Sequence, residues 1–181
     1  MSKKTLTLDS KEMNLFEEHL FKMYRREYGP NGYTPQMGSD GARITFALSE
    51  QKQGKTIFSI ILKPEASPLD PDAISYRVEA IRRSTRHEHQ KAVQGLCDAF
   101  LWGCWVGHAH NSVLISNDDL KSAGESFWIR RVSSAVNMGM VVAIAAGSGK
   151  PYRIIGQEAL EEFFEMHGYT QSCVALVSPK P

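Results

Sequence analysis

Cysteine is scarce in this sequence, and its three residues form no recognisable pair. Cys97, Cys104 and Cys173 are an odd number, and no C-x-x-C motif occurs. Disulfide-framework domains and structural zinc fingers both need more cysteines at closer spacing. We therefore expect all three thiols to be reduced, as in a cytoplasmic protein.

Long hydrophobic runs are also missing. The amino-terminal stretch MSKKTLTLDSKE has no apolar core of the kind that secretory signals carry. The longest apolar run, 138–146, is far shorter than the roughly 20 residues that cross a bilayer. These features predict a cytoplasmic protein with no membrane partner.

The sequence has no excess of charge of either sign. Lys and Arg together number 21, Asp and Glu number 20, and the net charge is +1. That balance gives no general reason to expect nucleic acid or a membrane surface as a partner. Three short basic clusters are typical of solvated helix faces; they are Arg25-Arg26, Arg82-Arg83-Arg86 and Arg130-Arg131. Nucleic acid is therefore an open but unfavoured partner, and a protein or peptide partner is favoured.

The composition that is present is that of an ordinary globular protein. Of the 181 residues, 42% are hydrophobic and 23% charged, which fits one domain with a sizeable core. The class predicted by the alternation of segments is α+β, a single domain over 1–181 with a central mixed β-sheet and flanking helices. The run 140–146 has no polar alternation, so we expect a central strand buried on both faces.

Local patterns place the remaining elements. Asp9 or Ser10 predicts the cap of a helix that ends at Gly29-Pro30, with Gly29 in a left-handed cap. Residues 29–41, rich in Gly, Pro, Asn and Asp, predict a mobile loop. The other predicted strands are 4–8, 42–49, 56–62, 74–81, 102–108, 152–155 and 173–177; the other predicted helices lie near 93–101, at 117–137 and near 160–168.

The densest group of chemically active residues lies between His108 and Asp119. The sequence reads GHAHNS and then SNDDL, from Ser116 onward. In an extended backbone residues i and i+2 point to the same side, so His108 and His110 can present two imidazoles to one ion. Asp119, at the start of the next helix, can add a third ligand. Two nitrogens, one carboxylate and an open fourth position are how catalytic zinc is held.

The stretch WGCWVGHAHNSVLISNDDL resembles the core of the JAMM (JAB/MPN-type) zinc metallopeptidases. That family has a hydrophobic strand, a His-x-His-Pro, a short loop and a Ser-x-x-Asp that opens a helix. The resemblance implies zinc bound by His108, His110 and Asp119, with Ser116 hydrogen-bonding the oxyanion. It also implies a JAB/MPN-like, cytidine-deaminase-like architecture and hydrolysis of peptide or isopeptide bonds.

The general base of the family has no clear counterpart here. The family's glutamate opens a strand in a Glu-x-x-Gly-like context, and this sequence has none. Asp40 and Glu50 are the two candidates by position, and Glu50 also has the character of a hairpin residue. In addition, Asn111 replaces the family's proline, and the loop from His110 to Ser116 is shorter.

A structural interpretation of the same residues stays open. Ser116-x-x-Asp119 is also the pattern of a capped helix start, where an acid is favourable against the helix dipole. A second His-x-His, His87-Glu88-His89, precedes a helix and is predicted to be a solvated helix start. The alternative function is therefore a non-catalytic interaction or accessory protein with a degenerate JAB/MPN-like fold, contacting nucleic acid or a protein complex.

Overall fold

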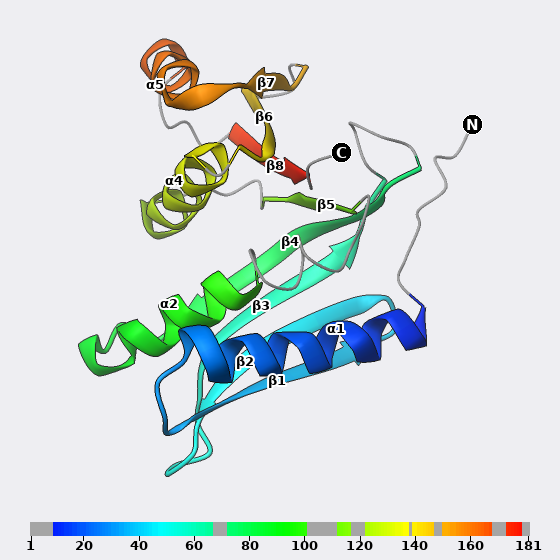
Figure 1. Ribbon diagram of the computed structural model, residues 1–181, viewed down its shortest axis with the longest axis vertical. Helices are drawn as coiled ribbons and strands as arrows, with labels where there is room; N and C mark the ends of the chain where they lie inside the picture. The colour runs from blue at the N-terminus through cyan, green and yellow to red at the C-terminus, as the bar shows by residue number, and fades with distance from the viewer. Residues whose placement is uncertain are drawn as a thin grey trace. The chain divides into compact units, whose positions relative to one another are not determined.

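Residues 9–66, 72–100, 112–116, 122–137, 139–146, 150–167 and 173–178 are described by the computed structural model of this chain (Figure 1). Contacts divide the chain into two units, Met1–Ser112 and Val113–Pro181, and each is described by itself. Both contain helices and antiparallel strands, so the predicted α+β class is confirmed. The single domain over 1–181 and the JAB/MPN-like architecture stay predictions.

Helix α1 (Ser10–Met23) opens the first unit and confirms the predicted cap at Asp9. The Asp9 carboxylate accepts a hydrogen bond from the Glu12 N–H at 2.8 Å, and the Glu12 carboxylate accepts one from the Asp9 N–H at 2.8 Å. This reciprocal arrangement satisfies two amides that would otherwise lack partners at the start of the helix. Phe16 and Leu20, one helical turn apart, form its buried face.

The end of this helical segment differs from the prediction at Gly29. After Met23 the backbone continues as a π-helical segment, Tyr24–Tyr28, and Gly29 then has φ −100° and ψ 134°. Gly29 is extended, so the predicted left-handed cap is wrong. The reason for glycine here is steric, because a Cβ atom at this position would overlap the ring of Tyr24.

Tyr24 carries a hydroxyl that the fold buries. The residue is 1% exposed, and its Oη makes no hydrogen bond within the described residues. Burial raises the pKa of this phenol well above its ordinary value. A buried hydroxyl without a partner costs about 1–3 kcal/mol.

Tyr24→Phe is therefore expected to leave the free energy of unfolding unchanged or to raise it by about 1 kcal/mol. Urea denaturation followed by circular dichroism checks this, and a clear loss of stability would contradict it.

Four strands form the sheet of the first unit: β1 (Tyr33–Asp40), β2 (Arg43–Glu50), β3 (Thr56–Pro64) and β4 (Ile74–Arg83). They run antiparallel in the order β1-β2-β3-β4. The predicted strands at 42–49, 56–62 and 74–81 are confirmed, as is the hairpin turn between the first two. Gly54 closes that turn with φ 62°, a left-handed conformation that glycine adopts without strain.

Strand β1 occupies most of the segment predicted as a mobile loop, and that prediction is wrong for these residues. The strand pairs with β2 along its whole length, from Tyr33 opposite Glu50 to Asp40 opposite Arg43. Because β1 lies at the edge of the sheet, Pro35 is tolerated there without breaking a second ladder. Pairing with a strongly β-prone neighbour outweighs the weak local propensity.

The core of the first unit lies between this sheet and helices α1 and α2 (Gln90–Asp98) (Figure 1). Its centre is a group of three phenylalanines. The ring centroid of Phe46 on β2 lies 5.4 Å from that of Phe16 and 4.8 Å from that of Phe100. All three are at most 2% exposed. Leu96 and Cys97 are buried with them, as predicted for this helix. Cys97 is a free thiol. Cys104 and the side chain of Cys173 lie outside the described part of the chain.

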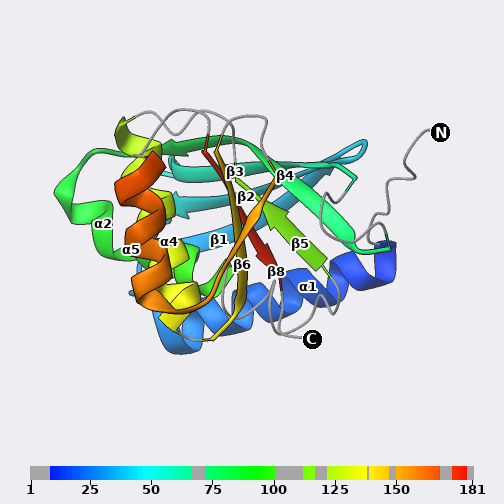
Figure 2. The ribbon, with the colours of Figure 1, turned by 90° about the horizontal axis from the view of Figure 1, so that it is seen from above.

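The remaining strands are β5 (Ser112–Ile115), β6 (Val141–Ala146), β7 (Tyr152–Ile154) and β8 (Cys173–Ser178), which pair in the order β5-β8-β6-β7. Helix α4 (Ser122–Asn137) packs against β6 and α5 (Gly156–His167) (Figure 2). Val142, Ala143 and Ile144 are at most 3% exposed, so the predicted central strand is confirmed. The described pairs within both units are antiparallel, where the sequence predicts a mixed sheet.

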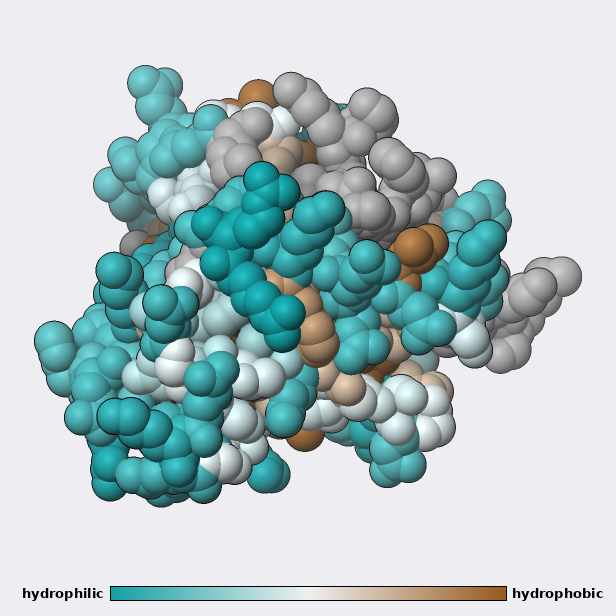
Figure 3. Space-filling view, turned by 60° about the horizontal axis from the view of Figure 1, so that its bottom comes forward, coloured by the Kyte–Doolittle hydropathy of each residue, from teal (hydrophilic) through white to brown (hydrophobic). Residues whose placement is uncertain are grey.

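The described helices include none that is both long and apolar enough to span a membrane. The surface in Figure 3 is mostly hydrophilic, with hydrophobic residues in small separate areas. Four large hydrophobic side chains of the described residues are exposed: Leu15, Tyr152, Ile155 and Met166.

Candidate metal centre and its surroundings

The predicted zinc ligands His108, His110 and Asp119 lie outside the described residues. Between them, β5 ends at Ile115 and Ser116 follows it directly. Ile115 and Ser116 are both 0% exposed. The predicted oxyanion residue, Ser116, is therefore buried at the carboxyl end of a strand.

The strand that precedes Ser116 is held by pairing with β8. Leu114 lies opposite Val177, and Ile115 lies opposite Leu176. This ladder holds β5 in place up to Ile115, the residue before Ser116. The described extended backbone runs from Ser112 to Ile115, after His108 and His110 in the sequence.

The two candidate bases lie at opposite ends of strand β2. Asp40 ends β1 opposite Arg43, where β2 begins, and it is exposed. Glu50 ends β2 and belongs to the next hairpin, because its N–H donates to the Lys55 carbonyl at 2.9 Å. At about 3.3 Å per residue, the two ends of β2 are roughly 23 Å apart. At most one of the two carboxylates can therefore serve a single metal site.

Neither carboxylate is oriented by a hydrogen bond within the described structure. A general base has to be held within reach of the proton it accepts. The position of Glu50 confirms its hairpin character, and Asp40 ends β1 just before the turn at the other end of β2.

By its chemistry, the predicted donor set fits zinc, which prefers imidazole nitrogen together with carboxylate oxygen in tetrahedral sites. Among the residues that the structure describes, no three His, Cys, Asp or Glu side chains gather into a group that could hold a metal ion. His108, His110 and Asp119 are not among those residues, so the zinc site stays a prediction.

No protein-family model matches this chain, and no curated protein matches it. The resemblance to the JAMM metallopeptidases therefore rests on the residues from His108 to Asp119 and on the elements around them.

The second His-x-His differs from its predicted solvated state. His87 is exposed, but His89 is only 3% exposed in the short 3-10 segment His87–His89. The Nδ1 atom of His89 lies 2.9 Å from the Ser84 hydroxyl, and its ring meets that of Tyr33 edge-on at 6.1 Å. The pattern around His87–His89 contains no signal of this burial, because the burial depends on Tyr33, which begins strand β1.

The basic cluster Arg82-Arg83-Arg86 also differs from its prediction. Arg82 and Arg83 end strand β4, and Arg86 follows in the connection to α2, so the cluster does not lie on a helix face. All three are exposed, as predicted. Their position at the end of a strand brings them together with residues of β2 and β3, which periodicity alone does not indicate.

Proposed function

We propose that this chain is a zinc-dependent hydrolase of the JAMM kind that acts on peptide or isopeptide bonds of a protein or peptide substrate in the cytoplasm. The observation that carries the proposal is the run from His108 to Asp119, where two imidazoles, a hydroxyl and a carboxylate follow the family's order. The burial of Ser116 after β5, followed by α4 and the buried strand β6, supports it.

Each residue in this proposal has a separate role. His108, His110 and Asp119 hold the metal, and zinc, when bound, supplies a Lewis acid for the scissile carbonyl. The Ser116 hydroxyl donates a hydrogen bond to the negative charge that develops on that carbonyl oxygen. Its burial strengthens such a bond, because electrostatic interactions weaken in contact with water. A carboxylate, Asp40 or Glu50, accepts a proton from the water that attacks the carbonyl carbon and passes it to the leaving amine nitrogen.

A second candidate is a non-catalytic interaction protein that keeps this arrangement without the chemistry. The observation that favours it is that the two acids end strands beside the turns at opposite ends of β2, where neither is oriented by a hydrogen bond within the described structure. Without a positioned base, a metal site binds but does not cleave at a useful rate.

Hydrolysis of a fluorogenic isopeptide-linked peptide separates the two candidates. The tag-free protein is expected to cleave it, to lose activity with a chelator, and to recover it with zinc. Because only one acid can reach the site, either Glu50→Gln or Asp40→Asn is expected to lower kcat by roughly 10²–10⁴, while the other serves as its matched control. A zinc-loaded protein without activity would instead favour the interaction role, and two active variants would exclude both acids as the base.

A further inference from the structure

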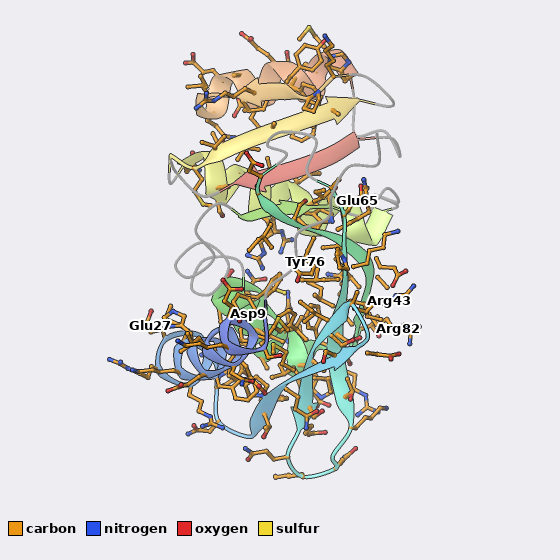
Figure 4. The ribbon with its side chains drawn as sticks, turned by 90° about the vertical axis from the view of Figure 1, so that its right-hand side faces the viewer. Asp9, Glu27, Arg43, Glu65, Tyr76 and Arg82 are labelled. Carbon is orange, nitrogen blue, oxygen red and sulfur yellow. The ribbon has the colours of Figure 1, made fainter. Side chains whose placement is uncertain are left out.

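A surface hollow of about 780 Å³ lies over strands β2, β3 and β4 of the first unit. Thr45 and Ala47 line it and alternate along β2 with the buried Ile44 and Phe46, so the hollow is on the side of the sheet opposite the core. Figure 4 shows Arg82 on the side away from α1. The helices that cover the other face leave this one open.

Four cations line the hollow, and none of the described residues that line it is acidic. The side chains of Lys55, Arg82 and Arg83 form no ion pair or hydrogen bond within the described residues. Arg86 has one, a contact of 3.5 Å between its guanidinium and the exposed carboxylate of Glu88. The charge of this cluster is therefore largely uncompensated, although the net charge of the chain is only +1.

The other arginines of the same sheet are paired. Arg43 donates two hydrogen bonds to Glu79, at 2.7 and 2.9 Å, and these hold the pKa of the Glu79 carboxyl below its ordinary value. Arg77 donates two hydrogen bonds to Glu65, at 2.5 and 2.6 Å. Arg43 and Arg77, outside the hollow, are thus each paired with a glutamate, whereas the side chains of Lys55, Arg82 and Arg83 inside it have no ionic partner within the described residues.

Neutral donors add to the cations in the hollow. Five hydroxyl side chains line it: Thr45, Thr56, Ser59, Ser84 and Thr85. His89 lines it as well. Its buried Nε2 makes no hydrogen bond within the described structure, and a carboxylate oxygen of Glu88 lies 3.5 Å from this atom. Hydroxyls, guanidinium groups and ring nitrogens are the groups that contact phosphate oxygens in nucleic-acid complexes.

We propose that this hollow binds the phosphate backbone of a nucleic-acid duplex. The cations lie at the end of the β3–β4 ladder, from Arg82 opposite Ser59 to Arg86 beyond the last residue of β4, a spread that suits a row of phosphates better than a single anion. Single-stranded nucleic acid is bound largely by stacking on aromatic rings. The rings that line the hollow, Phe58 and His89, are only 2% and 3% exposed, so the contacts are to the backbone. This site is independent of the proposed hydrolase.

Fluorescence anisotropy with labelled 20-base-pair DNA and RNA duplexes tests the proposal. Micromolar binding is expected near physiological salt, and four phosphate contacts give a slope of about −3.6 for log K against log salt. Arg82→Gln combined with Arg83→Gln is expected to weaken binding more than about tenfold and to reduce that slope by about 1.8. Both arginines are exposed, so the variant keeps its fold, as circular dichroism would show.

Arg43→Gln is the control, since it removes one positive charge, where the double variant removes two, from an ion-paired position outside the hollow. Its binding is expected to stay within about twofold of wild type. Three results would each overturn the proposal. The first is that neither duplex binds with a Kd below about 100 µM, and the second is that Arg43→Gln weakens binding as much as the double variant does. The third is that the protein binds oligo-dT, phosphatidylserine vesicles, polyglutamate or inorganic phosphate as tightly as a duplex or more tightly.

Discussion

Replacement of His110 by alanine is expected to weaken zinc binding by more than about a hundredfold. Mutation of a group that only orients a metal ligand lowers metal affinity ten- to a hundredfold. Loss of a ligand itself is therefore expected to lower zinc affinity by more than that. Isothermal titration of the metal-free protein with zinc measures the change. The wild type is expected to bind one zinc per chain, and His108→Ala and Asp119→Ala are expected to behave like His110→Ala.

The second His-x-His provides the control for this experiment. His87 is exposed at the start of a short helical segment in the first unit, and His87→Ala is expected to leave zinc affinity unchanged. If His87→Ala and His110→Ala weaken zinc binding equally, the zinc is bound non-specifically by histidines, and the proposed site is wrong.

Phe46→Ala is expected to lower the free energy of opening of the first unit by about 3–5 kcal/mol. Phe46 is 1% exposed and contacts Phe16 and Phe100 edge-on or tilted, geometries that add about 0.5–1.5 kcal/mol per aromatic pair. Removing its ring leaves a cavity beside Phe16 of α1 and Phe100, which follows the end of α2. Hydrogen exchange of the β2 and β3 amides reports the change for this unit.

The comparison for Phe46→Ala is Lys52→Ala, in the exposed turn between β2 and β3. That change is expected to stay within about 0.5 kcal/mol of wild type. A loss for Phe46→Ala below about 1 kcal/mol would mean that the three phenylalanines are not the centre of the core.

Much of the fold follows from the sequence where local pattern and burial agree. The cap at Asp9, the hairpin at Gly54 and the buried run Val142 to Ile144 each depend on neighbouring residues, and each is confirmed. Strand β1 could not be predicted in this way. Its composition is that of a loop, and its strand character comes from pairing with β2, which a local pattern does not contain.

The side chains that matter for binding show the same limit. Arg82, Arg83 and Arg86 are visible in the sequence as a short cluster, but the hollow beside them also needs Lys55 from another strand connection. His89 is hidden for the same reason, because Tyr33 and Ser84 cover it. For the metal centre, the proposed ligands come from the sequence motif alone. The structure adds one observation, the buried position of Ser116 after β5.

Diffraction at the zinc absorption edge, from crystals of the tag-free protein, tests the proposed metal centre most directly. The account predicts one anomalous peak per chain, with a ring nitrogen of His108 and of His110 at about 2.0–2.1 Å and a carboxylate oxygen of Asp119 at about 2.0–2.2 Å. An ordered loop with no peak, with the two imidazoles on opposite faces, or with Asp119 only capping its own helix would contradict it.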